Sequence, residues 1–356
     1  MIILGSTGSI GVNALNIVRK FNLNVEVLVA GNNTELLNEQ IEEFKPRFVA
    51  VANKEAAKNI RHKKVFFSQD GIVETIQRAD STLVVNSLVG FAGLVPTIES
   101  IKCGKRVALA NKETLVVAGS FIDMKKITPI DSEHFGLWYL LQDKIIEKMT
   151  ITASGGSFRD TPVDILKSAT VKEALAHPNW SMGKKITIDS ATMTNKLFEL
   201  LEAMWLFETQ KLDAIIETKS IIHAMIDFKD GSTTAHIANA NMQLPIAYAM
   251  LGRVEEQILK PVDLVEIGTL EFRKIDPARY AIWEIKDDIL TKPHLGAVVN
   301  AANEEAISHF FEGKIGFLDI SKKTLQSYKK FEDFKPSNLD DIFHIDSEVR
   351  AFVNSS

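Results

Sequence analysis

The sequence has one cysteine and no long apolar run. Cys103 has no second cysteine with which to form a disulfide, which also excludes a zinc site built from cysteines and fits a reducing cytoplasm. No apolar run reaches the roughly 18 residues that a membrane span requires. Met1 leads directly into Ile2-Ile3-Leu4 and a glycine turn, which leaves no room for a charged leader and a cleavage site. We therefore expect a soluble cytoplasmic protein that does not bind a membrane.

Neither sign of charge is in large excess. The chain has 41 lysines and arginines against 46 aspartates and glutamates, a net charge of −5. Such a balance gives no general attraction for nucleic acid or anionic lipid, so any bound anion needs a local site. The length of 356 residues and the hydrophobic content of 46 % are typical of a globular protein of two or three domains.

Short β-branched runs alternate with amphipathic stretches up to residue 130. The predicted strands are Ile2–Leu4, Val25–Ala30, Phe48–Ala52, Val65–Phe67, Leu83–Val85, Arg106–Leu109 and Ile127–Ile130. Stretches between them, such as 12–21 and 34–44, space their apolar residues three or four apart, which predicts helices. Regular alternation predicts right-handed crossovers and a parallel sheet. The fold class is therefore α/β, with an N-terminal Rossmann-like dinucleotide-binding domain at residues 1–130.

The pattern changes after residue 130, where predicted strands come in neighbouring pairs. Residues 214–218, 221–228 and 233–239 are strand-like. Asp230-Gly231 lies between the last two and favours a tight turn there. This pattern is typical of a central α+β catalytic domain, which we place at residues 131–259. Residues 260–278 contain two prolines and a glycine and are predicted to be a connector. Only helical periodicity follows, so residues 279–356 are expected to form a C-terminal helical bundle.

A glycine-rich turn links the first predicted strand to the first predicted helix. In Gly5-Ser6-Thr7-Gly8-Ser9-Ile10-Gly11 the glycines allow a sharp turn, and the helix N-terminus favours a pyrophosphate. A dinucleotide fingerprint requires this strand–turn–helix context, although the first glycine departs from the G-x-G-x-x-G spacing. The alternative is a glycine turn that only packs the helix against the strand.

The end of the second strand favours NADPH over NADH. NAD-binding folds usually have Asp or Glu there for the ribose 2′-hydroxyl, whereas this chain has Gly31-Asn32-Asn33. The Gly31 backbone and the two amides could accept a 2′-phosphate, since no carboxylate repels it. The alternative is an ordinary turn that caps the next helix.

Two carboxylates, Asp131 and Glu133, follow the last strand of the first domain. In an extended chain, residues two apart point to the same side and can converge on one point. Adjacent carboxylates repel unless they share a cation or a proton, and oxygen ligands favour Mg²⁺ or Mn²⁺. The alternative is a solvated helix cap, because Asp and Ser are preferred there.

Hydroxyl side chains gather at the expected start of a helix within residues 186–199. That helix would present Asn195, Lys196 and Glu199 on one face, and hydroxyls, an amide and a lysine at a helix N-terminus make a phosphate site. The hydroxyls are those of Ser190, Thr192 and Thr194. The alternative is a capped helix with a Lys–Glu pair on its surface. Glu202 would then only continue that exposed face.

Two loops could complete that site. Ser154-Gly155-Gly156 follows another strand and offers a hydroxyl and backbone N–H groups to an anion or a sugar. Residues 177–183 combine an imidazole, an indole and a thioether in a loop, because a proline discourages helix there. Such large side chains must pack on something. They pack either on a substrate, in which case the loop is a mobile lid, or on the protein core. His223, on an apolar strand, would alone more often be a satisfied core residue.

Taken together, these motifs resemble the 1-deoxy-D-xylulose 5-phosphate reductoisomerases of the non-mevalonate isoprenoid pathway. The match also includes Ala110-Asn111-Lys112-Glu113, Asp131-Ser132-Glu133-His134, Ile222-His223, Met242, Pro245-Ile246-Ala247 and Asn300-Ala301-Ala302-Asn303-Glu304, in the family's order. The resemblance implies an oxidoreductase that rearranges 1-deoxy-D-xylulose 5-phosphate with Mg²⁺ or Mn²⁺ and reduces the rearranged aldehyde with NADPH to 2-C-methyl-D-erythritol 4-phosphate. It also implies a homodimer.

The resemblance assigns site residues by position. The implied metal ligands are Asp131, Glu133 and Glu199. The implied substrate contacts are Ser132, Ser154, His177, Trp180, Met182, Ser190, Asn195, Lys196, His223 and Met242, with Trp180 and Met182 in a mobile lid. The implied cofactor contacts are Thr7, Gly8, Ser9, Ile10, Gly31, Asn32, Asn111, Lys112 and Glu113, to which the turn analysis adds Asn33. The expected catalytic residues are Lys112, Glu133, His177 and Lys196.

Two departures from the family pattern are local. Glu217-Thr218-Lys219-Ser220 stands where the family commonly has His-Pro-Gln-Ser, and Asn32 stands where a basic residue is frequent. They bear on the turn before His223 and on the strength of 2′-phosphate binding, not on the reaction. The alternatives are an NADP-dependent dehydrogenase of another small phosphorylated substrate and a non-catalytic NADP-binding sensor.

Overall fold

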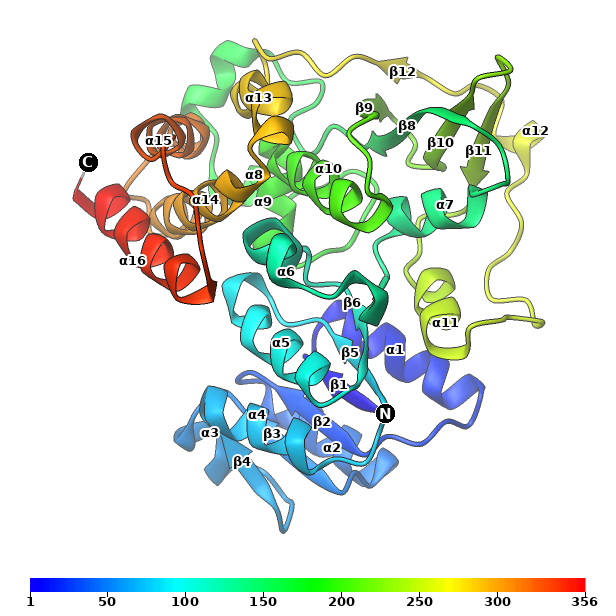
Figure 1. Cartoon of the computed structure of the whole chain (residues 1–356), viewed down its shortest axis with the longest axis vertical. Coiled ribbons are helices and arrows are strands. Elements are labelled where there is room, and N and C mark those ends of the chain that lie inside the picture. The colour runs from blue at the N-terminus through cyan, green and yellow to red at the C-terminus, as the bar shows by residue number, and fades with distance from the viewer. Residues whose placement is uncertain (356) are drawn as a thin grey trace. The chain divides into compact units, whose positions relative to one another are not determined.

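The structure is a computed structural model that describes residues 1–355 (Figure 1). The chain divides into two compact units. Unit 1 contains residues 1–114, 122–132 and 241–260, and unit 2 contains residues 115–121, 133–240 and those from 261 onward. Within the described residues, no helix combines the length and the apolar character that crossing a bilayer demands.

Unit 1 is built on a seven-stranded parallel sheet, as the alternating pattern predicted. Its strands are β1 (Ile2–Leu4), β2 (Val27–Ala30), β3 (Phe48–Val51), β4 (Val65–Phe67), β5 (Leu83–Asn86), β6 (Arg106–Leu109) and β7 (Ile127–Pro129). They lie in the order β4-β3-β2-β1-β5-β6-β7, with every neighbouring pair parallel. The order reverses between β1 and β5, and ligands of such sheets bind at the carboxyl ends of the strands beside this switch point.

The helices of unit 1 connect these strands. They are α1 (Ser9–Lys20), α2 (Thr34–Phe44), α3 (Lys54–Lys58), α4 (Ser68–Arg78), α5 (Leu94–Lys102) and α11 (Gln243–Leu251), with 3₁₀ turns at Gly90–Gly93 and Met124–Lys126. The helix α6 (Lys112–Ala118) begins in unit 1 and leads into unit 2, where Gly119–Phe121 forms a further 3₁₀ turn.

The helix α11 belongs to unit 1, although the sequence analysis expected it within the central domain at residues 131–259. Its buried residues Ile246 and Met250 join the same core as Ile3, Leu28 and Val85 of the parallel sheet. Its position along the chain suggested that α11 belongs with residues 131–259. Burial of these apolar side chains against the parallel sheet places it in unit 1 instead. The four-part division of the chain stays a prediction.

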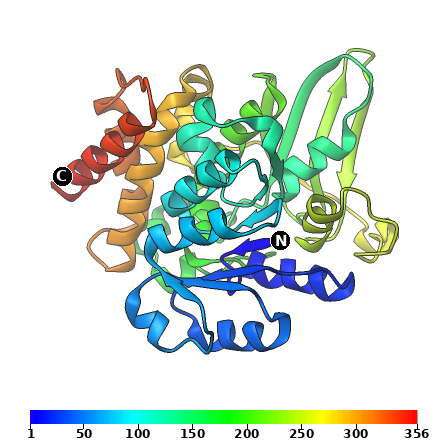
Figure 2. The same ribbon diagram turned by 60° about the horizontal axis from the view of Figure 1, so that its bottom comes forward.

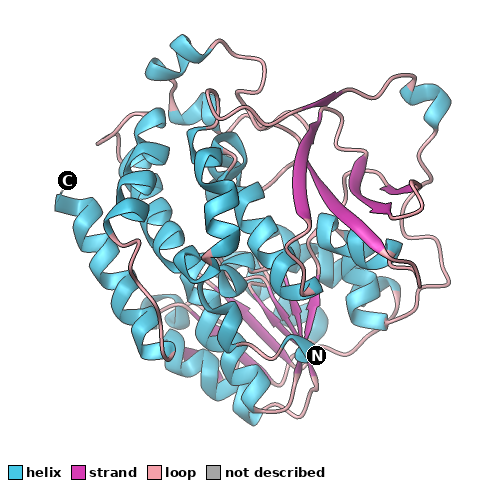
Figure 3. Ribbon diagram, turned by 45° about the horizontal axis from the view of Figure 1, so that its top comes forward, coloured by secondary structure: helices cyan, strands magenta, loops and turns pink. Residues whose placement is uncertain are grey.

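Unit 2 contains a mixed five-stranded sheet (Figure 3, magenta). Its strands are β8 (Ile146–Ala153), β9 (Leu212–Glu217), β10 (Ile222–Phe228), β11 (Thr233–Ile237) and β12 (Phe272–Arg273), in the order β11-β10-β8-β9-β12. Only β8 and β9 pair in parallel. The predicted turn between β10 and β11 is confirmed, since Gly231 has the positive φ of 86° that a glycine favours.

Helices account for most of the rest of unit 2. They are α7 (Ser132–Leu140), α8 (Val171–Ala174), α9 (Lys184–Thr192), α10 (Thr194–Phe207), α12 (Leu264–Ile267), α13 (Lys286–Thr291), α14 (Gly296–Phe311), α15 (Phe317–Lys330) and α16 (Leu339–Ser355), with 3₁₀ turns at Val163–Ser168, Ala281–Ile285 and Pro293–Leu295. The long helix α14 packs against α15 and α16 (Figure 2, orange to red). The expected C-terminal helices are therefore confirmed.

Gly11 allows α1 to pack closely on the turn that follows β1. A β-carbon at this position would lie 2.2 Å from the Gly5 carbonyl oxygen. We predict that Gly11→Ala lowers the free energy of unfolding by about 1–3 kcal/mol, because overpacking moves the backbone. Urea unfolding measures the loss, and Gly31→Ala is the matched control because its β-carbon would meet nothing within 4 Å. Equal stabilities of the two variants would contradict the packing role.

Candidate active site

The turn after β1 presents the N-terminus of α1. Gly8 is the N-cap residue, no side chain caps the helix, and both Gly8 and Ser9 are exposed. Thr7 and Ile10 beside them are partly exposed. Exposed backbone at a helix N-terminus suits a phosphate, while Gly11 supplies the close packing that the alternative proposed. The two interpretations of the glycines are thus compatible.

Gly31, Asn32 and Asn33 follow β2 and are all exposed. The Asn33 side chain accepts a hydrogen bond from Leu36 N at 3.3 Å, so it caps α2 as the alternative interpretation stated. Asn32 Oδ1 accepts from Asn53 Nδ2 at 3.0 Å. The cofactor roles of these three residues stay predictions.

Asn111, Lys112 and Glu113 follow β6 and are buried. Asn111 Nδ2 donates to the carbonyl oxygens of Leu88 and Gly90, both at 2.8 Å, and to Glu113 Oε2 at 3.2 Å. Asn111 therefore shapes the loop after β5. Lys112 Nζ forms an ion pair of 2.6 Å with Asp131 Oδ2.

The expected extended geometry at Asp131 and Glu133 is wrong. Ser132 and Glu133 are the first residues of α7, and Asp131 directly precedes the helix. An acidic residue before a helix is stabilised by the unpaired N–H groups and by the helix dipole, and this local preference outweighs continuation of the strand.

The segment around Ser190 also differs from its predicted form. The helix α9 ends at Thr192, Met193 takes a left-handed φ of 70°, and α10 begins at Thr194. Ser190 thus lies in the last turn of α9 and not at the start of a single helix. The predicted shared face of α10 is confirmed, because both Asn195 Nδ2 and Lys196 Nζ donate to the Glu199 carboxylate.

Lys196 lies between two carboxylates in unit 2. Its Nζ donates to Glu133 Oε1 at 2.7 Å and to Glu199 Oε2, and an oxygen of each carboxylate lies within 4.8 Å of the other. The side chains of Lys196 and Glu199 are only 3 % and 1 % exposed, so the alternative of a surface pair is wrong. Burial alone would lower the pKa of Lys196, but the charges of Glu133 and Glu199 outweigh burial and raise it.

The donor set at this point fits a hard divalent cation. Glu133 and Glu199 together with the Lys196 ammonium leave one negative charge in a buried setting. Only one residue separates Asp131 from Glu133, so the covalent chain keeps their α-carbons within about 7 Å. Carboxylate oxygens are the ligands that Mg²⁺ and Mn²⁺ prefer. Asp131, Glu133 and Glu199 remain the candidate ligands.

Two buried residues near this cluster were named from the sequence but given no role in the site. His134 Nε2 donates to the Glu199 carbonyl oxygen at 2.8 Å, and its Nδ1 lies 3.2 Å from Glu202 Oε2. Both side chains are buried, so the interpretation of Glu202 as part of a surface face is wrong. The sequence did contain a signal for this burial. Leu197, Phe198 and the apolar residues after them occupy every side of α10, and a helix that is apolar all round is buried together with its polar residues.

His177 connects the Ser154 loop with Ser190 of α9. Its Nδ1 accepts the backbone N–H groups of Asn179 and Trp180, at 3.2 and 2.9 Å. The neutral ring therefore carries its proton on Nε2, which donates to Ser154 Oγ at 2.9 Å and Ser190 Oγ at 3.2 Å. Burial and then the positive charge of Arg159 lower the pKa of His177 to about 4. The site thus offers neutral N–H and O–H donors.

Trp180 and His223 lie together in unit 2. The Trp180 ring packs edge-on against His223, with ring centroids 6.1 Å apart, and is partly exposed, as is Met182. His223 Nε2 donates to the Ala238 carbonyl oxygen at 3.1 Å, which is the satisfied arrangement that the sequence analysis weighed. Met242 belongs to unit 1 and packs on its core. The lid and substrate roles of these residues stay predictions.

Unit 1 has the sheet, the switch point and the glycine turn of a dinucleotide-binding fold, and unit 2 gathers hydroxyls, a neutral imidazole, a lysine and carboxylates. These features are typical of a dinucleotide-dependent oxidoreductase with a phosphorylated substrate.

Comparison with known proteins identifies the family. Residues 1–119 match the 1-deoxy-D-xylulose 5-phosphate reductoisomerase model, and residues 127–207 and 237–352 match two C-terminal domain models of the same enzyme. The chain is 56 % identical to the reductoisomerase of Nautilia profundicola, with all of both chains covered, and 51 % identical to that of Wolinella succinogenes, with 99 % of each covered. The chain belongs to the 1-deoxy-D-xylulose 5-phosphate reductoisomerase family.

Solved structures agree with this assignment. A DOX-P reductoisomerase in complex with NADPH, fosmidomycin and magnesium has a TM-score of 0.93 and 31 % identity, covering 99 % of this chain and 97 % of that one. The Zymomonas mobilis enzyme in complex with NADPH has a TM-score of 0.87 and 30 % identity, with the same coverage. The resemblance stated from the motifs and the predicted fold class are both confirmed.

We predict that the His177 ring stays neutral well below the ordinary pH range for histidine. Its pKa of about 4 lies below that of the unfolded chain, so the unfolded state binds the extra proton between about pH 6.5 and 4 and stability falls as the pH drops through this window. An NMR titration of the ring resonances, assigned with His177→Asn, measures the midpoint. The same titration in urea is the control. A folded-state midpoint near 6.5 would contradict the burial argument.

Proposed function

We propose that this protein rearranges 1-deoxy-D-xylulose 5-phosphate and reduces the product to 2-C-methyl-D-erythritol 4-phosphate with NADPH. Similarity to reductoisomerases over the full chain carries the proposal. One solved relative is in complex with NADPH, fosmidomycin and magnesium and another with NADPH, which supports NADPH and a divalent cation here. Neither a plain dehydrogenase nor a non-catalytic sensor is favoured, because the relatives that match the whole chain are named reductoisomerases.

Asp131, Glu133 and Glu199 are the proposed ligands of Mg²⁺ or Mn²⁺. When bound, such an ion polarises the ketone and hydroxyl oxygens of the substrate as a Lewis acid. Lys196 holds Glu133 and Glu199 in place through its ammonium group. Lys112 holds Asp131 in the same way within unit 1. We assign Glu133, Lys112 and Lys196 to proton transfer and charge compensation during the rearrangement.

The substrate phosphate is proposed to bind at Ser154, Ser190 and His177. Their Oγ and Nε2 atoms already lie within hydrogen-bond distance of one another, so they face a common point. Asn195 and Lys196, one helix further on, extend the donor set. Binding energy from this non-reacting group orients the carbons that rearrange. Ser132, Trp180, Met182, His223 and Met242 are the further proposed substrate contacts.

The cofactor is proposed to bind at the carboxyl edge of the parallel sheet. The α1 N-terminus at Thr7–Ile10 suits the pyrophosphate, and the exposed Gly31–Asn33 turn suits the 2′-phosphate. Asn111, Lys112 and Glu113 complete the proposed contacts. The protein orients the nicotinamide, and hydride transfer is the cofactor's own chemistry. The single cysteine, Cys103, is exposed and unpaired, which supports a place in the reducing cytoplasm.

We further propose a homodimer formed through β11 and α7. The strand β11 is an edge of its sheet, and sheet edges pair readily with another chain. Trp138 and Ile237 expose 47 % and 39 % of their surfaces there, beside Leu141. Phe135 of α7 packs against His236 on one face of β11, and the exposed Ile237 points to the other face of the strand. A second copy of the chain paired along this edge would cover exposed apolar side chains of both elements.

We predict that NADPH oxidation with 1-deoxy-D-xylulose 5-phosphate stops when EDTA removes the divalent cation and returns when Mg²⁺ is added. Glu199→Gln should lower turnover by about a hundredfold, because it removes one anionic ligand from a small set. NADPH binding, measured by fluorescence, should be unchanged. Glu147→Gln, an exposed carboxylate on β8, is the matched control. Near-normal turnover of Glu199→Gln would sink the ligand assignment.

We predict that Ile237→Lys converts the dimer to a monomer. A buried unpaired charge costs several kcal/mol at an apolar interface. Sedimentation velocity should give about twice the chain mass of 39.6 kDa for the unmodified protein and the single mass for the variant. Val265→Lys, which replaces an exposed apolar residue on α12, should remain dimeric. A dimer that survives Ile237→Lys would place the interface elsewhere.

A further inference from the structure

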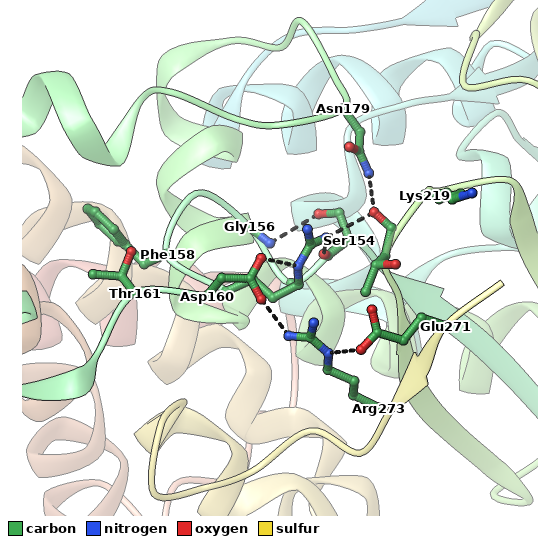
Figure 4. A network of polar contacts seen from close by, with 12 residues as sticks. Ser154, Gly156, Phe158, Asp160, Thr161, Asn179, Lys219, Glu271 and Arg273 are labelled. Carbon is green, nitrogen blue, oxygen red and sulfur yellow. Dashed lines mark hydrogen bonds and ion pairs between the residues drawn. The ribbon is translucent and has the colours of Figure 1, made fainter. Parts of the chain in front are cut away.

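Arg159 lies where the loop after β8 meets the turn between β9 and β10, in unit 2. We propose that Arg159 is a positioning residue that fixes the phosphate-binding loop and the lid to one backbone carbonyl, that of Thr218. The proposal rests on the proposed function, since it assigns Ser154 and residues 177–183 to substrate binding. Figure 4 shows the polar contacts around this point.

The guanidinium joins two segments. Arg159 Nη1 donates to the Ser154 carbonyl oxygen at 2.7 Å and to the Thr218 carbonyl oxygen at 2.9 Å. The methylene groups of the Arg159 side chain pack against Gly155. A β-carbon at position 155 would lie 2.6 Å from Arg159 Cδ, and Gly155 has a φ of +88°. Any other residue at 155 would therefore push the guanidinium away from both carbonyls.

The lid uses the same carbonyl. Asn179 Nδ2 donates to the Thr218 carbonyl oxygen at 2.9 Å (Figure 4). It also donates to Ser220 Oγ at 2.8 Å. The Asn179 N–H donates to His177 Nδ1, and His177 Nε2 donates to Ser154 Oγ. These bonds close a ring through Ser154, Arg159, Thr218, Asn179 and His177. Loss of Arg159 opens the ring at the point where the loop meets the turn that carries Thr218.

The turn that carries Thr218 is rigid, so it can serve as an anchor. The buried Glu217 carboxylate accepts the backbone N–H groups of Lys219, Ile221 and Ile222, at 2.8, 2.7 and 3.2 Å. This carboxylate stands in the segment that departs from the family's His-Pro-Gln-Ser pattern. The turn is thus held by a charge-assisted network of its own.

Outside the ring, the Arg159 guanidinium contacts a mostly exposed carboxylate, and such an exposed ion pair contributes little to its position. Arg159 Nε donates to Asp160 Oδ2 at 3.1 Å, and Arg273 Nη1 donates to Asp160 Oδ1 at 2.6 Å. Arg273 Nε in turn donates to Glu271 Oε1 at 2.8 Å (Figure 4). Arg273 is itself 38 % exposed and lies on β12, which pairs with β9. It touches neither carbonyl of the ring, so it is a matched control for the loss of an arginine.

The test compares Arg159→Met, Arg159→Lys and Arg273→Met in steady-state kinetics. Methionine keeps most of the apolar stem but removes both hydrogen bonds, so Arg159→Met should raise KM for 1-deoxy-D-xylulose 5-phosphate by about tenfold to hundredfold. Arg159→Lys should recover part of this loss, because an ammonium keeps the N–H donors and the charge but stands on a side chain one bond shorter. KM for NADPH should stay within about twofold in all three variants, and Arg273→Met should resemble the unmodified protein.

A double-mutant cycle tests the shared carbonyl. Asn179→Ala removes the other donor to Thr218, so its effect on KM combined with that of Arg159→Met should be clearly smaller than the product of the single effects. Multiplicative effects, or an Arg159→Met variant with lowered thermal stability but normal KM, would overturn the proposal. If the unmodified protein does not oxidise NADPH with 1-deoxy-D-xylulose 5-phosphate, the proposed function has failed instead.

Discussion

The buried ammonium of Lys196 is the interaction on which the candidate site in unit 2 depends. Two carboxylates from different helices, Glu133 of α7 and Glu199 of α10, would repel each other in a setting with little water. Lys196 compensates them, and His134 fixes the backbone of α10 at Glu199 from the other side. The cluster therefore holds carboxylates in a fixed arrangement that a divalent cation can use, at the cost of desolvating three charges.

The fold could be predicted from the sequence because its strongest signals are repetitive. Seven β-branched runs in alternation with helical stretches specify a parallel sheet, and all seven predicted strands are present within a residue or two at each end. The failures were local. Asp131 and Glu133 were read as extended chain, yet the preference of acidic residues for a helix N-terminus decided the geometry. A left-handed residue at Met193, which no pattern signals, divides the expected helix in two.

The candidate site could be predicted only in part. Asn195, Lys196 and Glu199 were found from helical spacing, which is a property of neighbours along the chain. Their contact with Glu133, the ring through His177 and Arg159, and the His134–Glu202 pair all join residues distant in sequence. Such partnerships depend on the packing of whole elements, so periodicity could not reveal them. The family resemblance assigned the other candidate residues motif by motif, but it assigned neither Arg159 nor the His134–Glu202 pair.

The path of the chain has a consequence for any attempt to isolate its parts. The backbone passes from one compact unit to the other five times, and residues 241–260 complete the first unit long after its sheet has been made. A fragment that stops at residue 130 would lack α11, and the apolar surface that Ile246 and Met250 cover would meet water. More than a hundred further residues must be synthesised before that surface is covered, so unit 1 can complete its core only late in the folding of the chain.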